Sequence, residues 1–327
     1  MTMLVVALAA EESDLLSFRE WRALRERTVL FEDAAHPLRA LLDAAGTSTD
    51  SLDEVPPVDD DAVALVVDPR SALLVELAEE GAEISVGAAE VPDPMTAAVG
   101  APIARRASKS LGELALVMAR LRGPGGCPWD HEQTHESLQV HLLEEAHEVL
   151  EAIDEGRLGP ELEEELGDLL LQVVFHAQMA ADDGRFDIEG VARSIVAKLV
   201  HRHPHVFSDT SVSGPSEVVA NWETLKAAEK TERSGPFDGI GSGLPALLAA
   251  HKTQKRAAAL GFDASEDDAR AGIEKSTASG DVGETLFWVV ALARAKGIEP
   301  EAALRRATAA FREGLGAQIP LEPRGPC

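Results

Sequence analysis

The chain contains the segment HLLEEAHEVLEAID at residues 141–154, followed after a short turn by ELEEELGDLLLQVVFHAQMA at residues 161–180. In both segments apolar residues recur at helical spacing, which predicts two amphipathic helices joined by the turn at residues 156–160. The apolar stripes comprise Leu142, Ala146, Val149 and Ile153 on the first helix, and Leu162, Leu166, Leu169, Leu170, Val173 and Ala177 on the second. The sequence therefore predicts an antiparallel helical hairpin here.

Two acidic pairs flank these stripes. Glu145 and Glu148 lie three residues apart on the first helix, and Glu165 and Asp168 do so on the second. Side chains at i and i+3 share a helix face, so a hairpin can bring all four carboxylates together. Such carboxylates repel one another and resist desolvation. A hard divalent cation, Mg²⁺ with Mn²⁺ as a substitute, would resolve that conflict, so the pattern favours an oxygen-only metal site.

Other interpretations of these residues stay open. Glu144 and His147 have the Glu-x-x-His spacing of di-iron bundles, but His176 lies about two turns beyond the place where a second histidine would be needed. Oxygen-only ligation points to magnesium or manganese and not to iron. A solvated face is the ordinary explanation of any single acidic pair. The run HRHPH at residues 201–205 resembles a zinc cluster only weakly, because a proline interrupts it and no cysteine accompanies it.

Composition excludes several classes of partner. The 327 residues carry a formal net charge of −27, which argues against binding nucleic acid or an anionic membrane. The two cysteines, Cys127 and Cys327, form no disulfide framework, so we expect a reducing compartment, the cytoplasm. No run of about 18 apolar residues is present, so no membrane span is expected.

The pattern changes along the chain. Residues 1–92 alternate between short apolar runs (4–8, 29–31, 62–67, 82–86) and helical segments (15–27, 37–45, 71–80), which predicts a small α/β region. Three prolines between residues 91 and 102 predict a linker at 93–105. Long helical patterns then predict an all-α domain at 106–233 and a second helical domain at 234–327. The predicted fold is mainly α, with two helical bundles in tandem after the α/β region.

A partial internal repeat relates the two helical domains. GDLLLQVV at residues 167–174 resembles GETLFWVV at residues 283–290, an offset of 283 − 167 = 116 residues. In the second copy the acidic pair becomes Asp281 and Glu284, and only Glu274 remains of the preceding acidic set. We therefore expect the second copy to be a scaffold.

Two further pairs are candidates for substrate binding. Lys198 and Arg202 are spaced i, i+4 and could contact phosphate oxygens. Trp222 and Lys226 repeat that spacing, and a tryptophan beside a basic residue could stack on a base. A solvated basic edge explains Lys198 and Arg202 equally well, and a place in the core explains Trp222 equally well.

Several motifs together resemble the MazG family of nucleoside triphosphate pyrophosphohydrolases over residues 110–315. The motifs are GCPWD at 126–130, EEAHE at 144–148, ELGD at 165–168, RHPHVF at 202–207, LPAL at 244–247, QKR at 254–256 and GFD at 261–263. Their order and spacing make the resemblance specific.

The resemblance implies an all-α, Mg²⁺-dependent enzyme that converts an NTP or dNTP to the monophosphate and diphosphate, usually as a homodimer. The family's metal ligands correspond to Glu145, Glu148, Glu165 and Asp168, and Glu144 matches the remaining motif acid. Its nucleotide contacts correspond to Lys198, Arg202, Trp222 and Lys226.

The N-terminal region faintly resembles part of a tetrapyrrole methylase domain, mainly through residues 28–42. A Gly-rich turn would be expected after its first strand, but AAEE stands at residues 9–12. We expect no methyl-donor binding there. Because this region and the second copy both look vestigial, a non-catalytic scaffold that senses nucleotides or docks a partner is the alternative function.

Overall fold

The computed structural model describes residues 2–87, 91–208, 210–228 and 235–316. The chain divides into two compact units, Met1–Trp222 and Glu223–Cys327, each of which is described by itself. Within the described ranges, no helix combines the length and the apolar character needed to cross a bilayer.

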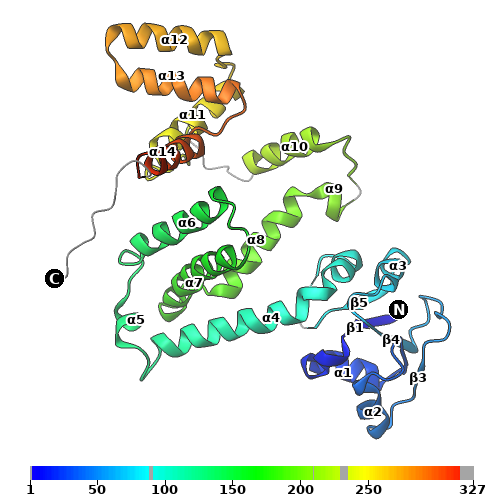
Figure 1. The fold of residues 1–327 in the computed structure, drawn as a ribbon. Helices are drawn as coiled ribbons and strands as arrows, with labels where there is room; N and C mark the ends of the chain where they lie inside the picture. The colour runs from blue at the N-terminus through cyan, green and yellow to red at the C-terminus, as the bar shows by residue number, and fades with distance from the viewer. Residues whose placement is uncertain (1, 88–90, 209, 229–234, 317–327) are drawn as a thin grey trace. The chain divides into compact units, whose positions relative to one another are not determined.

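A five-stranded parallel sheet forms the N-terminal region (Figure 1). Its strands are β1 (Leu4–Ala7), β2 (Thr28–Phe31), β3 (Thr49–Ser51), β4 (Val63–Val67) and β5 (Glu83–Ser85), arranged in the order β3-β2-β4-β1-β5. The apolar β-branched composition of β1 and β4 suits strands buried on both faces. β3 was not predicted, because it is short and polar and becomes a strand only by pairing Thr49 with Val29 of β2.

Helices cover both faces of this sheet. On one face α1 (Phe18–Arg25) and α2 (Pro37–Ala44) bury Leu24, Leu38 and Leu42 against β1, β2 and β4. On the other face α3 (Leu73–Glu79) and the start of α4 (Pro94–Arg122) bury Leu74, Leu77, Ala97 and Ala101. The single helix predicted at residues 15–27 is instead a 3₁₀ turn, η1 (Ala10–Leu15), followed by α1. The predicted α/β region is otherwise confirmed.

The predicted linker at residues 93–105 is wrong, because these residues belong to the continuous helix α4. Pro94 lies in the first turn of α4, where a backbone N–H has no intrahelical partner to lose. Asp93 caps the helix by accepting from the Thr96 N–H at 2.9 Å. Ala97, Ala98 and Ala101 are buried, so packing against the α/β core keeps the segment helical despite Pro102.

A buried ion pair joins α4 to α1. Arg105 and Glu20 have side chains only 2% and 3% exposed, with Nη2 and Oε1 2.5 Å apart. Arg105 also donates from Nε to the Ala7 carbonyl at 2.9 Å. The Arg105 charge and hydrogen bonds outweigh burial and hold the pKa of Glu20 below its ordinary value. The pair thus fixes the first half of α4 to the sheet.

Helices alone build the rest of the first unit, as predicted (Figure 1). They are α5 (Pro128–Glu132), α6 (Gln139–Asp154), α7 (Pro160–Asp182), α8 (Ile188–Arg202), α9 (Pro204–Phe207) and the first part of α10 (Pro215–Ala228). Their core contains Met118, Leu138, Val174, Phe175 and Met179. The hairpin of α6 and α7 is confirmed. The predicted boundary at 233/234 falls outside the described residues, and the unit boundary lies at Trp222/Glu223.

The second unit is also helical, with α11 (Ala246–Ala259), α12 (Glu266–Ser279), α13 (Val282–Ala295) and α14 (Pro300–Gly316). α12 and α13 form a hairpin in which Gly272 faces Trp288 so closely that a Cβ atom would lie 2.3 Å from the indole. Asp281 accepts from the Glu284 N–H at 2.8 Å and caps α13. One of the remaining acids of the repeat therefore caps a helix, and the scaffold role of the second copy stays a prediction.

Candidate functional site

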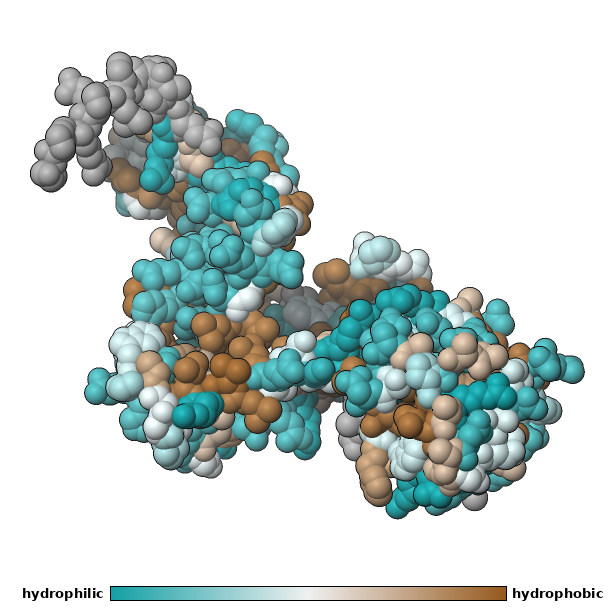
Figure 2. Space-filling model, turned by 60° about the horizontal axis from the view of Figure 1, so that its bottom comes forward, coloured by the Kyte–Doolittle hydropathy of each residue, from teal (hydrophilic) through white to brown (hydrophobic). Residues whose placement is uncertain are grey.

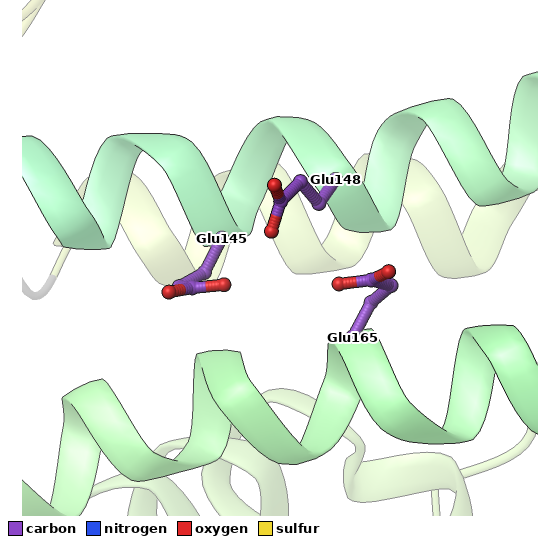
Figure 3. Close-up of side chains that lie close together, drawn as sticks. All are labelled: Glu145, Glu148 and Glu165. Atoms are coloured by element: carbon purple, nitrogen blue, oxygen red, sulfur yellow. The ribbon is translucent and has the colours of Figure 1, made fainter.

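Three glutamates converge between α6 and α7. Glu145 and Glu148 extend from α6 toward Glu165 on α7 (Figure 3). One carboxylate oxygen from each lies within 4.8 Å of the others. Glu145 and Glu165 are half-buried and Glu148 is exposed. The i, i+3 spacing on α6 presents two acids to the partner helix, and the antiparallel hairpin brings the third opposite them.

The three charges disfavour one another. Burial, then a hydrogen bond and repulsion from Glu148, raise the pKa of Glu145 above its ordinary value, with further repulsion from Asp168 and Glu165. Burial raises the pKa of Glu165 too, with repulsion from Glu148 among the next causes. Both carboxylates are thus harder to ionise together than apart.

This donor set fits a divalent cation. Arg157, in the turn between the helices, lowers the pKa of Glu165, but its effect is smaller than the repulsion from the acids. Arg157 itself pairs with Glu155 at 2.7 Å. Three carboxylates with little compensating charge match a hard cation that prefers oxygen ligands. The sequence interpretation overlooked Arg157, although its place beside the acidic helices was visible.

Asp168 lies outside this group of three. It is exposed and comes one turn after Glu165 on α7, close enough for its charge to raise the pKa of both Glu145 and Glu165. Its role as a fourth ligand stays a prediction.

Glu144 takes a different position from the converging acids. Its carboxylate lies 3.3 Å from the Nδ1 atom of His141, and its side chain is 59% exposed. The His141 ring in turn packs edge-on against Trp129 of the GCPWD loop, with centroids 6.4 Å apart. The loop motif therefore reaches the acidic motif through His141.

Arg122 anchors the loop before α6, a role that the sequence interpretation missed. Its Nε donates to Asp182 at 2.7 Å and its Nη1 donates to the Asp130 carbonyl at 2.5 Å. The guanidinium also lies 5.5 Å from the centre of the Phe175 ring. Only 9% of the Arg122 side chain is exposed, so this basic residue is structural. A lone arginine at a helix end gave no signal of these long-range contacts.

The predicted nucleotide contacts are partly brought together. The Arg202 guanidinium of α8 lies 5.3 Å from the centre of the Trp222 ring of α10, a cation–π arrangement. Lys198 is exposed one turn earlier on α8. Lys226 follows Trp222 by one turn on α10 but belongs to the second unit. Arg202 and Trp222 thus lie against each other. The substrate-binding roles of Lys198, Arg202, Trp222 and Lys226 stay predictions.

The alternative metal sites gain no support. His176 lies against His135, at 2.7 Å between Nδ1 atoms, and not beside Glu144 or His147. In the histidine run, the His203 Nδ1 atom faces the Leu199 carbonyl. Among the residues that the structure describes, the three glutamates are the only group of at least three His, Cys, Asp or Glu able to hold an ion.

Comparisons with known proteins show which family the chain resembles. The profile of the MazG nucleotide pyrophosphohydrolase domain matches residues 133–207. The Thermotoga maritima nucleoside triphosphate pyrophosphohydrolase/pyrophosphatase MazG is 41% identical over 214 residues, which cover 62% of this chain and 82% of that protein. An Escherichia coli K12 nucleoside triphosphate pyrophosphohydrolase is 40% identical over 221 residues, covering 62% and 84%. A Mycobacterium tuberculosis protein of the same name is 42% identical over 168 residues, covering 51% and 50%.

Proposed function

The chain belongs to the MazG family of nucleotide pyrophosphohydrolases, and we propose that its first helical bundle hydrolyses nucleoside triphosphates to monophosphates and diphosphate. It is a hydrolase acting on the bond between the α and β phosphates. The observation that carries the proposal is the convergence of Glu145, Glu148 and Glu165 inside the matched segment. Clearance of non-canonical or excess nucleotides is the role we assign to this activity.

A cation held by the three glutamates and Asp168, Mg²⁺ with Mn²⁺ as a substitute, would neutralise the triphosphate and lower the pKa of water. Glu144, which follows His141 by three residues and contacts its ring, is assigned to orient or deprotonate the attacking water. Lys198 and Arg202 would neutralise the departing diphosphate. Arg202 stacked on Trp222 places a cation and an aromatic surface side by side, which suits a nucleotide.

The alternative, a non-catalytic scaffold, is less favoured. A scaffold needs only the apolar pattern, and the second hairpin keeps that pattern while Asp281 caps a helix. The first hairpin instead holds its acids at close range, although their mutual repulsion raises two pKa values. Retaining a repulsive cluster is expected where an ion is to be bound.

Diphosphate release is the direct test. The protein is incubated with a panel of NTPs, dNTPs and oxidised nucleotides, with Mg²⁺ or with EDTA, and diphosphate is detected through a coupled pyrophosphatase. We expect turnover only with the metal. Glu145→Gln and Glu165→Gln should each abolish it, whereas Glu163→Gln, which removes an exposed charge elsewhere on α7, should not.

Two results would decide for the scaffold. One is the lack of diphosphate from every nucleotide despite tight nucleotide binding. The other is full turnover in both site variants. The nucleotide panel also measures the base and sugar preference, on which the nucleotide-clearing role depends.

We also propose that the chain works in the cytoplasm as a homodimer. Large apolar side chains on α6 and α8 are at least 37% exposed: Leu142, Leu143, Ile195, Val196 and Leu199. Figure 2 shows brown apolar surface gathered on the helical part of the molecule. Exposed large apolar side chains of this kind support an interface with a second copy. Analytical ultracentrifugation of the wild type and of Ile195→Glu/Leu199→Glu tests it, and a monomeric wild type would exclude the dimer.

A further inference from the structure

We propose that His135, His176 and Arg185 form a latch that positions the acid-bearing helices, a role that rests on the proposed function. The α6–α7 hairpin is closed at one end by the covalent turn at residues 155–159. At its open end, the segment before α6 meets the second half of α7 through His135 and His176, 41 residues apart in sequence. The three glutamates lie between these two ends.

The latch has a defined geometry. The Nδ1 atoms of His135 and His176 are 2.7 Å apart, and the ring planes differ by only 7° with centroids 5.0 Å apart, so the rings meet edge to edge through these nitrogens. The Arg185 Nη2 atom lies 2.8 Å from His135 Nε2. The His176 Nε2 atom is buried and finds no hydrogen-bond partner within the described part of the chain. This chain of contacts links α7, the residues after it and the entry to α6.

Arg185 fixes where the protons lie. A guanidinium can only donate, so His135 Nε2 must accept and the ring proton of His135 must sit on Nδ1. That proton is donated to His176 Nδ1, which places the proton of His176 on its buried Nε2 atom. Both imidazoles are therefore neutral. A further proton on His176 Nδ1 would set N–H against N–H at the ring pair, so protonation of His176 breaks the latch.

The surrounding charges allow this opening. Arg185 also donates to Asp183 at 2.8 Å, which gives its guanidinium a second partner when the latch opens. The pKa of Glu136 is lowered by hydrogen bonds from its own backbone and from Thr134, and less by the charges of His135 and Arg185. Further charged groups near the latch come from α4, α5 and α7: Arg122, whose Nη1 faces the Gln133 carbonyl, its partner Asp182, and His131.

Burial and then the neighbouring His135 lower the pKa of His176 below its ordinary value of 6.5. Above pH 6.5 the ring is neutral whether the chain is folded or unfolded, so its contribution to the latch is complete. As the pH falls from there through the folded-state pKa, the unfolded or opened state takes up the proton first and the contribution is lost. The latch should therefore weaken in mildly acidic solution.

The latch acts on the site through α7. Asp168 precedes His176 by eight residues, about 12 Å along the helix axis. The turn holds one end of the hairpin, and at the other end Leu138 shares a core with Phe175, so release at His176 removes one of two restraints there. α6 can then shift against α7 and spread the carboxylates. The affinity for Mg²⁺ should therefore fall when the latch opens. This loss adds to the direct competition between protons and Mg²⁺ for the glutamates.

The test compares Mg²⁺ binding at pH 7.5 and 5.5 in wild type and in His135→Phe/His176→Phe. Phenylalanines can neither form the Nδ1–Nδ1 hydrogen bond nor be protonated, so the variant keeps the latch open at both pH values and should bind Mg²⁺ more weakly than the wild type at pH 7.5. One linked proton changes an affinity by at most about tenfold per pH unit. We therefore expect the wild type to lose about three- to tenfold more affinity on acidification than the variant. His251→Phe is the matched control, because His251 is also half-buried with an unpartnered ring nitrogen, but lies in the second unit.

Imidazole NMR keeps the proposal testable if the double variant fails to fold. The wild type should show His176 as a neutral, fixed tautomer at pH 7.5, and Arg185→Gln should raise the pH at which His176 titrates. Three results would overturn the latch. The first is an equal loss of Mg²⁺ affinity on acidification in the wild type and the double variant. The others are a reduced pH dependence of Mg²⁺ affinity in His251→Phe as well, and an unchanged titration in Arg185→Gln. These readouts use the metal alone, so a failure of nucleotide hydrolysis would be seen separately.

Discussion

Removing charge from the glutamate group should preserve or raise the stability of the metal-free protein and lower the stability of the protein in Mg²⁺. Burial and the neighbouring acids raise the pKa values of Glu145 and Glu165, so the folded chain disfavours their charged forms when no ion is present. The variant Glu145→Gln/Glu165→Gln relieves this repulsion. We therefore expect its apoprotein to melt at the same temperature as wild type or above it, which is unusual for a double substitution at a functional site.

In the presence of Mg²⁺, the wild type should melt at a higher temperature than the double variant. At a Mg²⁺ concentration 100 times the dissociation constant, binding to the folded state alone adds about 2.7 kcal/mol to the free energy of unfolding. The first unit contains 222 residues, a size at which 1 kcal/mol raises Tm by about 2–4 °C. Wild type should thus gain about 5–11 °C on adding Mg²⁺, and the double variant should gain almost nothing.

Scanning calorimetry in EDTA and in Mg²⁺ measures both effects, with Glu163→Gln as the control for loss of one exposed charge on α7. In EDTA, wild-type stability should rise as the pH falls through the raised pKa values toward 4.5, because the folded state takes up protons first. The double variant should lack this rise. A lower apoprotein Tm in the variant, or a Mg²⁺ shift equal to that of wild type, would contradict a metal site at these glutamates.

Three further substitutions test the rest of the structure. Arg105→Met leaves Glu20 buried without its partner and should lower the free energy of unfolding in urea by about 3–5 kcal/mol. Glu20→Leu/Arg105→Met should recover most of that loss. Equal losses in the two variants would contradict the ion-pair argument. Gly272→Ala drives a methyl group into Trp288 and should destabilise the second unit by about 1–3 kcal/mol in thermal melting while diphosphate release persists. Trp222→Ala removes a stacking surface of about 1–3 kcal/mol, so KM should rise about five- to 150-fold with little change in kcat; an unchanged KM would exclude the stacking role.

Local periodicity made the helices predictable. The apolar stripes and the i, i+3 acidic pairs depend on neighbours within one or two turns, so the elements of the hairpin and the shared face of Glu145 and Glu148 could be found from the residues alone. The same reasoning failed where long-range packing overrides local signals. Three prolines indicated a linker at residues 93–105, but buried alanines of α4 against the sheet keep that segment helical.

The membership of the site was decided by the tertiary structure. Periodicity places an acid on a helix face, but the rotation and axial offset of α6 against α7 depend on core contacts between distant segments, such as Phe175 with Met118. Those contacts bring Glu165 to Glu145 and Glu148, leave Asp168 a turn away, and turn Glu144 toward His141. Local spacing therefore shows which residues could hold an ion, and the packing of the two helices selects which of them meet.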